Sequence, residues 1–378
     1  MKNPIPIVVA VALACAMPVQ AAKVFITPDR AIEVAAAKLK AGDTLILKKG
    51  VYRQSATLYG LRGEADRPIV IRGEPGVIIE PVERDGILIM GEDKTEYLVI
   101  EGLTVRGAKR AGIMVNSSKH VTIRHCIMAD NRVWGIQAIM SDHITVEDCE
   151  LSGSKEQHGV YFSTTDHPVV RRCRIHDNAG CGAHFNGDVT EGGDGMIMGA
   201  IVVDSIFYGN GKTGGSAINM DGVAHARILN NLIFNNRSGG ITSFKGNGIR
   251  AGDEHVIENN TVWFAPKAGR FAIQVLGNVT NVAIVRNVLV AGRGPVLEVS
   301  DAAVGGIHGD YNVYFMRGTG NVIDVDGRRM DLAAWQELTR RDARSLTLNP
   351  EFTNPGNSNF TITAKLPRDW PAVGYQAK

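Results

Sequence analysis

The chain has 378 residues, 43 of them glycine, and a formal net charge of +2. The near-zero charge argues against a general nucleic-acid-binding protein, which needs a basic face, but leaves room for a local basic groove. A chain of this length would ordinarily divide into several domains. A chain of stacked repeats can instead form one elongated domain, since each repeat buries its apolar face on the next.

Residues 1–21 have the pattern of a secretory signal peptide. An apolar core runs from Ile5 to Ala16, and Val19–Ala21 supplies small residues at a cleavage site. The apolar run is too short to span a membrane. The alternative is a lipoprotein acylated at Cys15, although the residues before Cys15 are a poor lipidation signal. We therefore predict a periplasmic or secreted protein without a transmembrane segment.

Residues 22–65 are expected to form an N-terminal cap and the first coil of a repeat structure. The stretch from Ile32 to Lys40 predicts a short amphipathic helix, and a strand begins at Asp43. A cap is needed because the open end of a solenoid exposes unpaired strand edges.

Residues 66–315 contain an imperfect repeat. One position recurs before short apolar runs, at spacings between 23 (126 to 149) and 32 (173 to 205) residues. Apolar residues alternate with period two, and a repeat of this length indicates a solenoid. The sequence predicts an all-β fold, a single-stranded right-handed parallel β-helix solenoid with short capping helices. The recurring position should form an internal ladder with free, buried thiols; it holds Cys126, Cys149, Cys173, Ser205, Asn231, Asn260 and Asn287.

The second strand of each repeat should present side chains outside the coil. Strand faces alternate, so the third residue of each quartet that begins with Gly, Ala or Val points outward. A second outward column lies two residues further along, and polar groups concentrate in residues 158–187 and 216–246. The first column reads Met114, Gln137, Tyr161, His184, Asn219, Thr242, Gln274 and Glu298, and the second reads Ser163, Asn186, Asp221 and Phe244.

This cluster suits cleavage of a uronate polymer by β-elimination. The reaction needs a group that neutralises the sugar carboxylate, a base for the proton on the adjacent carbon and an acid for the leaving oxygen. We assign His184, Tyr161 and Lys245 as catalytic, with His184 or Lys245 as the base and Tyr161 as the proton donor. The alternative is that these are ordinary solvated strand positions. Predicted substrate-binding residues are His158, Asn186, Asn219, Asp221, Arg270 and Gln274.

An insertion at residues 187–195 lengthens one repeat and should wall the predicted groove. Asp188, Glu191 and Asp194 lie in it among glycines. Carboxylates are the oxygen ligands that calcium prefers, so these three residues are a candidate calcium site, although their spacing is not that of an EF-hand. The alternative is that they are solvated acids of a loop.

Residues 316–378 are expected to form a C-terminal cap and tail. The sequence predicts a helix over 331–341, and the apolar residues around Phe352 and Phe360 should belong to a tail that covers the last coil.

The stretch from Gly42 to Tyr52, followed by Pro68–Ile71, resembles the opening coils of β-helical polysaccharide lyases. The repeats and the tail extend a general resemblance to β-helix proteins of bacterial envelopes over nearly the whole mature chain. That superfamily holds polysaccharide lyases, uronate epimerases and some glycoside hydrolases. Some of its calcium-dependent lyases use a Lys base with an Arg nearby, and Lys245 and Arg270 resemble that pair in type.

The resemblance implies a polysaccharide lyase that acts, as a monomer, on an acidic glycan. A uronate C5-epimerase is the second interpretation, because the Asp-Pro-His motif of the β-helical mannuronan epimerases is missing. A glycoside hydrolase would need two carboxylates about 5–10 Å apart, which Asp221 with Asp188 or Asp194 would supply. A non-catalytic glycan-binding or structural envelope protein is the remaining alternative.

Overall fold

The computed structural model describes residues 21–92, 95–318 and 320–377. Cys15 and all but the last residue of the predicted signal peptide lie outside this part. No helix of the described residues is long and apolar enough to cross a membrane.

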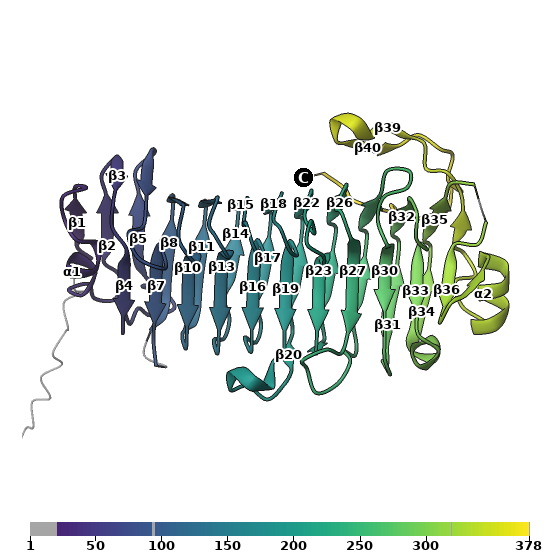
Figure 1. Ribbon diagram of the computed structural model, residues 1–378, viewed down its shortest axis with the longest axis horizontal. Helices are drawn as coiled ribbons and strands as arrows, with labels where there is room; N and C mark the ends of the chain where they lie inside the picture. The colour runs from purple at the N-terminus through teal and green to yellow at the C-terminus, as the bar shows by residue number, and fades with distance from the viewer. Residues whose placement is uncertain (1–20, 93–94, 319, 378) are drawn as a thin grey trace, which may run out of the picture.

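The protein is a rod of stacked coils, with α1 (Ile32–Ala36) near one end and α2 (Leu332–Thr339) at the other (Figure 1). Eleven coils, from β2–β4 to β34–β36, each contribute one strand to each of three sheets, which we call A, B and C. β1, β38 and β37 add a twelfth strand to sheets A, B and C in turn, and neighbouring strands are parallel except for β36 and β37. The predicted all-β parallel β-helix with short capping helices is confirmed.

The three sheets contain nearly all of the regular structure. Sheet A comprises β1 (Lys23–Ile26), β2 (Thr44–Leu47), β5 (Ile69–Gly73), β8 (Glu96–Glu101), β11 (Lys119–Arg124), β14 (Thr145–Glu147), β17 (Val169–Arg171), β21 (Ile201–Val203), β25 (Arg227–Leu229), β28 (Val256–Glu258), β31 (Val282–Val285) and β34 (Ile307–Asp310). Sheet B comprises β3 (Gly50–Tyr52), β6 (Val77–Ile79), β9 (Thr104–Arg106), β12 (Ile127–Ala129), β15 (Glu150–Ser152), β18 (Arg174–His176), β22 (Ile206–Tyr208), β26 (Leu232–Phe234), β29 (Thr261–Trp263), β32 (Val288–Ala291), β35 (Val313–Met316) and β38 (Leu346–Thr347). Sheet C comprises β4 (Ala56–Tyr59), β7 (Ile87–Met90), β10 (Ala111–Asn116), β13 (Trp134–Ile139), β16 (Val160–Ser163), β19 (Ala183–Asn186), β23 (Ser216–Asp221), β27 (Gly239–Phe244), β30 (Phe271–Val275), β33 (Leu297–Val299), β36 (Ile323–Val325) and β37 (Arg328–Met330). Two small pairs, β20 (Ile197–Met198) with β24 (Val223–Ala224) and β39 (Phe352–Asn354) with β40 (Asn359–Ile362), and three 3₁₀ turns, η1 (Val189–Glu191), η2 (Asp301–Gly306) and η3 (Pro355–Asn357), complete it.

The predicted internal ladder is confirmed. The backbone N–H of Asn231 donates to Asn260 Oδ1, and that of Asn260 donates to Asn287 Oδ1, each at 2.9 Å. In the same way, the backbone N–H of Asn287 donates to Asn312 Oδ1. Towards the N-terminus, the backbone N–H of Ser205 donates to Asn231 Oδ1, and that of Cys173 donates to Ser205 Oγ. The ladder satisfies buried backbone groups at each corner of the coil, where no strand partner is available. Cys126, Cys149 and Cys173 are buried free thiols, as predicted.

Glycine lies beside the first residue of several sheet C strands, because neighbouring coils approach closely there. A Cβ atom on Gly135 would lie 2.5 Å from the carbonyl oxygen of Gly159, and one on Gly159 would lie 2.8 Å from that of Gly182. Real Cβ atoms do not come that close to backbone, so the recurring glycine sets the spacing of the coils at this corner.

The C-terminal end differs from the sequence prediction. Helix α2 closes the rod, since Trp335 is fully buried and its indole N–H donates to Asp342 Oδ2 at 2.9 Å. The tail does not cover the last coil. It turns back along sheet B (Figure 1), where Phe360 packs on Phe234 and Val373 packs with Val288. The reason is an apolar outer face on sheet B that needs covering.

Candidate functional site

The two predicted outward columns of sheet C are confirmed by the strand register. Tyr161, His184 and Asn219 are aligned on successive strands, and Ser163, Asn186 and Asp221 are aligned two residues further along. Their exposure is low: 8% for Tyr161 and Asn219, and 3–4% for Asn186 and Asp221. These polar groups are therefore packed on one another and on adjacent loops instead of being ordinary solvated strand positions. We call this part of sheet C, from β13 to β23, the site face.

The sequence reasoning missed an aromatic residue on the site face. Trp134 begins β13, and its ring stacks on Tyr161 with centroids 5.8 Å apart and an interplanar angle of 20°. Its indole N–H donates to Gln157 Oε1 at 3.0 Å, which fixes the ring. Trp134 precedes the glycine that opens the predicted strand, so the two-residue alternation did not reach it. The repeat itself aligns Trp134 with His158 and would have identified it.

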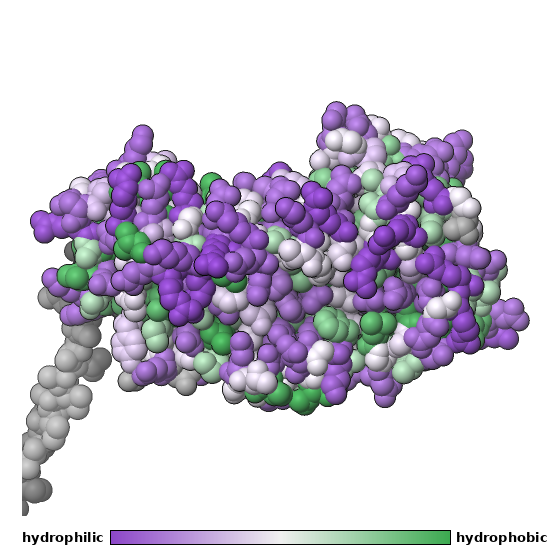
Figure 2. Space-filling view, in the orientation of Figure 1, coloured by the Kyte–Doolittle hydropathy of each residue, from purple (hydrophilic) through white to green (hydrophobic). Residues whose placement is uncertain are grey.

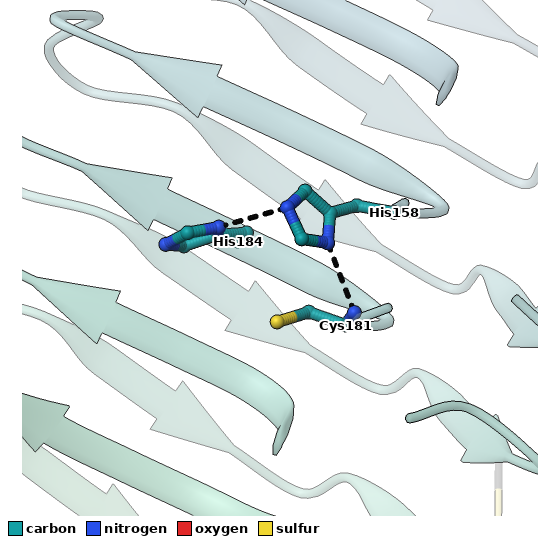
Figure 3. A group of neighbouring side chains, drawn as sticks. All are labelled: His158, Cys181 and His184. Atoms are coloured by element: carbon teal, nitrogen blue, oxygen red, sulfur yellow. Dashed lines mark hydrogen bonds between the residues drawn. The ribbon is translucent and has the colours of Figure 1, made fainter. Parts of the chain in front are cut away.

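A chain of hydrogen bonds connects the backbone to His184 (Figure 3). The backbone N–H of Cys181 donates to His158 Nδ1 at 2.9 Å, and His158 Nε2 lies 3.0 Å from His184 Nδ1. Because His158 Nδ1 faces a donor, the proton of this neutral imidazole must be on Nε2. His158 therefore donates to His184 Nδ1, and His184 carries its own proton on Nε2.

This arrangement corrects the role predicted for His158. Both of its ring nitrogens are already bonded within the protein, so neither is left to contact a substrate. His158 instead orients the imidazole of His184. The arrangement also changes the expectation for His184, whose unpartnered Nε2 carries an N–H donor instead of a free lone pair that would accept a proton.

Burial keeps both imidazoles neutral. Desolvation lowers the pKa of His184 to about 4, and it lowers the pKa of His158 well below the ordinary value, an effect that the neighbouring His184 reinforces. At neutral pH the chain from Cys181 to His184 thus carries no charge.

The buried histidines make the stability of the protein pH-dependent. The pKa of His184 and that of His255 are both lowered to about 4 by burial, whereas an unfolded histidine titrates near 6.5. Between these values the unfolded chain binds protons that the folded chain does not, so stability falls with pH from about 6.5 to about 4. We expect a constant urea midpoint above about pH 7 and a falling one below, with a shallower fall in His255→Asn. A midpoint equally steep in that variant would contradict this assignment.

Tyr161 is a neutral phenol in a polar surrounding. Burial raises its pKa, the hydrogen bond from Asn186 opposes that rise, and the charge of Glu191 adds to it. Asn186 Nδ2 donates to the Tyr161 hydroxyl at 3.0 Å. The hydroxyl of Ser163 donates to Glu191, so the insertion folds onto the site face. Tyr161 therefore keeps its phenolic proton at neutral pH.

Three polar atoms of the site face lack a partner. Of the six buried side-chain nitrogen or oxygen atoms without a hydrogen bond among the described residues, His184 Nε2, Asn186 Oδ1 and Gln137 Oε1 belong to β13 and β19. A buried polar group without a partner costs about 1–3 kcal/mol. Such a concentration on one face indicates that a polar ligand or water completes these bonds.

Asp221 holds the loop that carries Lys245. Its carboxylate accepts from the backbone N–H groups of Gly246 at 2.6 Å, Asn247 at 2.7 Å and Gly248 at 3.1 Å. Asp221 is therefore occupied by the loop and is not the free carboxylate that the predicted substrate-binding or hydrolytic role requires. Lys245 itself is exposed and makes no ion pair with any described residue.

The candidate calcium ligands are not brought together. Asp188 caps η1 by accepting from the backbone N–H of Thr190 at 2.8 Å. Glu191 accepts from Ser163, and Asp194 accepts from the backbone N–H of Met196 at 3.0 Å. The three are not among the clusters of potential ligands, with atoms within 4.8 Å of one another, that the described residues form. Each carboxylate is used locally to shape the insertion, which corrects the expectation of a shared site.

A cluster of His158, Cys181 and His184 does bring three potential metal ligands within 4.8 Å of one another. Its donor set does not suit a metal. If His158 Nε2 bound an ion, Nδ1 would face the Cys181 N–H without a proton, and the ring would have to be an anionic imidazolate. Burial also raises the pKa of the Cys181 thiol to about 12, which disfavours the thiolate that a metal needs.

The remaining predicted binding residues lie further along the rod. Gln274 is three strands from His184, and it accepts from Thr242 and donates to Glu298 at 2.9 Å each. Arg270 is exposed and its guanidinium lies 5.7 Å from the Phe271 ring centroid. At about 4.8 Å per strand, both lie roughly 14 Å or more from His184 and do not contact a group bound there.

Two loops border the site face on one edge. Figure 2 shows apolar side chains gathered at the lower edge of the rod, where Figure 1 places these loops. Val189 of the insertion and Ile249 of the Lys245 loop are 45% and 54% exposed and meet at Gly195.

A cavity of about 520 Å³ lies elsewhere, beneath the tail, and its lining contains no histidine, lysine or carboxylate side chain. The chemistry-bearing residues are thus on the site face.

Residues 76–214 match the family model described as "Right handed beta helix region", which agrees with the predicted handedness. No curated protein matches the sequence.

Several solved structures have the same fold. An alginate lyase from Paenibacillus sp. str. FPU-7 is 19% identical, with a TM-score of 0.60 over 80% of this chain and 99% of that one. A mannuronic-acid-specific polysaccharide family 6 lyase from human gut microbiota is 15% identical, with a TM-score of 0.56 over 80% and 82%. PfbA, a surface adhesin of Streptococcus pneumoniae, is 12% identical, with a TM-score of 0.61 over 78% and 83%. At these identities the likeness shows the fold.

Proposed function

We propose that the protein is a polysaccharide lyase that cleaves a uronate-containing glycan by β-elimination on the site face, in the periplasm or outside the cell. The observation that carries the proposal is the set of unpartnered polar atoms on β13 and β19 beside the stacked rings of Trp134 and Tyr161. Stacked aromatic rings with adjacent hydrogen-bonding groups suit a sugar ring. Two similar structures, an alginate lyase and a mannuronic-acid-specific lyase, support the choice of reaction.

A uronate carboxylate fits the donors available. His184 Nε2–H is buried without a partner, and the Asn219 side chain on the next strand makes no hydrogen bond with a described residue. A neutral donor strengthens its hydrogen bond as negative charge develops on the carboxylate, which is the condition for catalysis by a preorganised site. His184 thus stabilises the carbanion-like transition state without being charged.

Lys245 and Tyr161 carry out the two proton transfers of the reaction, Lys245 as the base and Tyr161 as the acid. Lys245 takes the proton from the carbon next to the carboxylate, and the freed electron pair forms a double bond as the glycosidic bond breaks. Tyr161, held protonated by its burial, gives a proton to the leaving oxygen. The side chain of Lys245 is exposed and forms no ion pair with a described residue, so it is available to a bound sugar. Its loop is held through the backbone N–H groups that donate to Asp221.

Replacing Lys245 with alanine should reduce kcat at saturating substrate by about 100-fold or more, the usual contribution of a general base. In the unmodified enzyme, the rate should show no inflection near pH 6.5, because His184 stays neutral down to about pH 4. The exposed Lys365→Ala is the matched control and should keep full activity. An inflection near pH 6.5, or a change in KM alone for Lys245→Ala, would remove the lysine from the base role.

The direct test is the ultraviolet absorbance of unsaturated uronate ends while the protein is offered polymers of mannuronate, guluronate and galacturonate. Growth of that absorbance with one polymer supports a lyase. Binding of a polymer without new absorbance, hydrolysis or epimerisation would favour a glycan-binding role, which the likeness to a surface adhesin keeps as the second candidate.

A further inference from the structure

Histidines recur at one corner of the rod, where sheet C turns into sheet A. His120, His143, His167 and His225 occupy this corner with positive φ angles of 51°, 53°, 50° and 56°. Glycine and asparagine adopt this backbone region at the lowest cost. Histidine is also among the residues enriched in this region, and these four imidazoles share one corner and one backbone conformation.

The imidazole rings of three successive coils are in contact, and those of His143 and His167 are stacked. The centroids of His120 and His143 are 4.8 Å apart, and those of His143 and His167 are 4.5 Å apart with an interplanar angle of 25°. His143 and His167 remain about half exposed, at 47% and 50% of their side-chain surface. The stack thus holds the imidazoles in fixed orientations while solvent still reaches them.

One carboxylate faces two of these rings. Asp142 Oδ1 lies 2.7 Å from His143 Nδ1 and 3.0 Å from His167 Nδ1. An ionised carboxylate accepts only, so both imidazoles carry their proton on Nδ1 and converge on the same oxygen.

We propose that Asp142 Oδ1, His143 Nδ1 and His167 Nδ1 bind one divalent transition-metal ion of the Zn²⁺ class. The three atoms lie within 4.8 Å of one another. Metal–ligand bonds of about 2.0–2.2 Å place neighbouring ligand atoms roughly 3 Å apart, and the two N···O distances already have that value. Two imidazoles with one carboxylate suit zinc and its neighbours, and leave the remaining coordination positions to water.

Binding requires each imidazole to move its proton from Nδ1 to Nε2, where the exposed side of the ring meets solvent, so that the Nδ1 lone pair faces the ion. No proton is released, and the carboxylate of Asp142 balances one of the two charges that the ion brings. Because Asp142 and His143 belong to one coil and His167 to the next, the ion would join successive coils of the rod. The site is separate from the site face and does not rest on the proposed reaction.

The test is isothermal titration of the untagged full-length protein with ZnCl₂ in a non-chelating buffer. We expect one site per chain, a rise in melting temperature that a chelator reverses, and at least about 100-fold weaker binding in Asp142→Asn and His167→Asn. His225→Asn is the matched control, since it removes an imidazole from the same corner and the same backbone conformation, and its affinity should be unchanged.

A crystal of the zinc-loaded protein should show an anomalous peak bonded to all three atoms. Affinity in Asp142→Asn equal to that of the unmodified protein would overturn the proposal, as would an ion bound elsewhere. Because the readouts are binding and anomalous scattering, a negative result leaves the lyase proposal untouched, and a failed lyase assay leaves this one untouched.

Discussion

His184→Ala should lower kcat on the uronate substrate by about 100-fold or more, the usual effect of removing one preorganised donor to a developing oxyanion. The fold should survive, because the side chain points outward from β19 and its loss leaves the internal ladder intact. Initial rates at saturating substrate measure the loss, and thermal melting checks the fold.

His184→Gln separates the donor role from the base role. Glutamine places an amide N–H near the position of Nε2–H but cannot accept a proton at neutral pH. Partial recovery of kcat relative to His184→Ala supports a neutral donor. His308→Ala, which removes an exposed imidazole at the far end of sheet A, is the matched control and should be fully active. If His184→Gln is as inactive as His184→Ala while both remain folded, the imidazole is needed as an acid or base.

Asn260→Ala should lower the free energy of unfolding by about 3 kcal/mol or more, because several buried groups lose their partners. Asn260 Oδ1 accepts from the backbone N–H of Asn231 at 2.9 Å and from its Nδ2 at 3.0 Å. Asn260 Nδ2 donates to the carbonyl oxygen of Ile228 at 2.8 Å and to Asn287 Oδ1 at 3.1 Å. None of these groups can reach water in the closed interior.

Urea unfolding of Asn260→Ala measures the loss, and Asn278→Ala is its control. Asn278 is exposed, and its side chain makes no hydrogen bond with a described residue, so its replacement should change the midpoint little. Equal midpoints for the two variants would mean that the ladder contributes nothing to stability.

The repeat made most of the fold predictable from the sequence. A period-two alternation in every coil fixes which side chains face inward, and the recurring Asn and Cys positions fix how one coil lies on the next. The outward alignment of Tyr161, His184 and Asn219 followed from this register alone. Such a structure is favourable for sequence reasoning because each coil contacts only its neighbours.

The chemistry of the site was less predictable, because it depends on which atom donates and which accepts each hydrogen bond. The strand register does not contain this information. The tautomer of His184 is set by the backbone N–H of Cys181 acting through His158, and a backbone group leaves no sequence signal. Asp221 was expected to meet substrate, but it binds three loop amides whose positions depend on the fold of that loop. Trp134 lies at a corner where the alternation changes phase.

The central claim is that the site face removes the proton next to a uronate carboxylate and expels the glycosidic oxygen. Proton NMR of the polymer products formed in D₂O tests it most directly. A lyase gives shorter chains with vinyl signals of unsaturated ends, and these should be absent with His184→Ala. Deuterium at the same carbon without chain cleavage would show an epimerase, and new reducing ends without vinyl signals would show a hydrolase. Either of these results would contradict the proposed reaction.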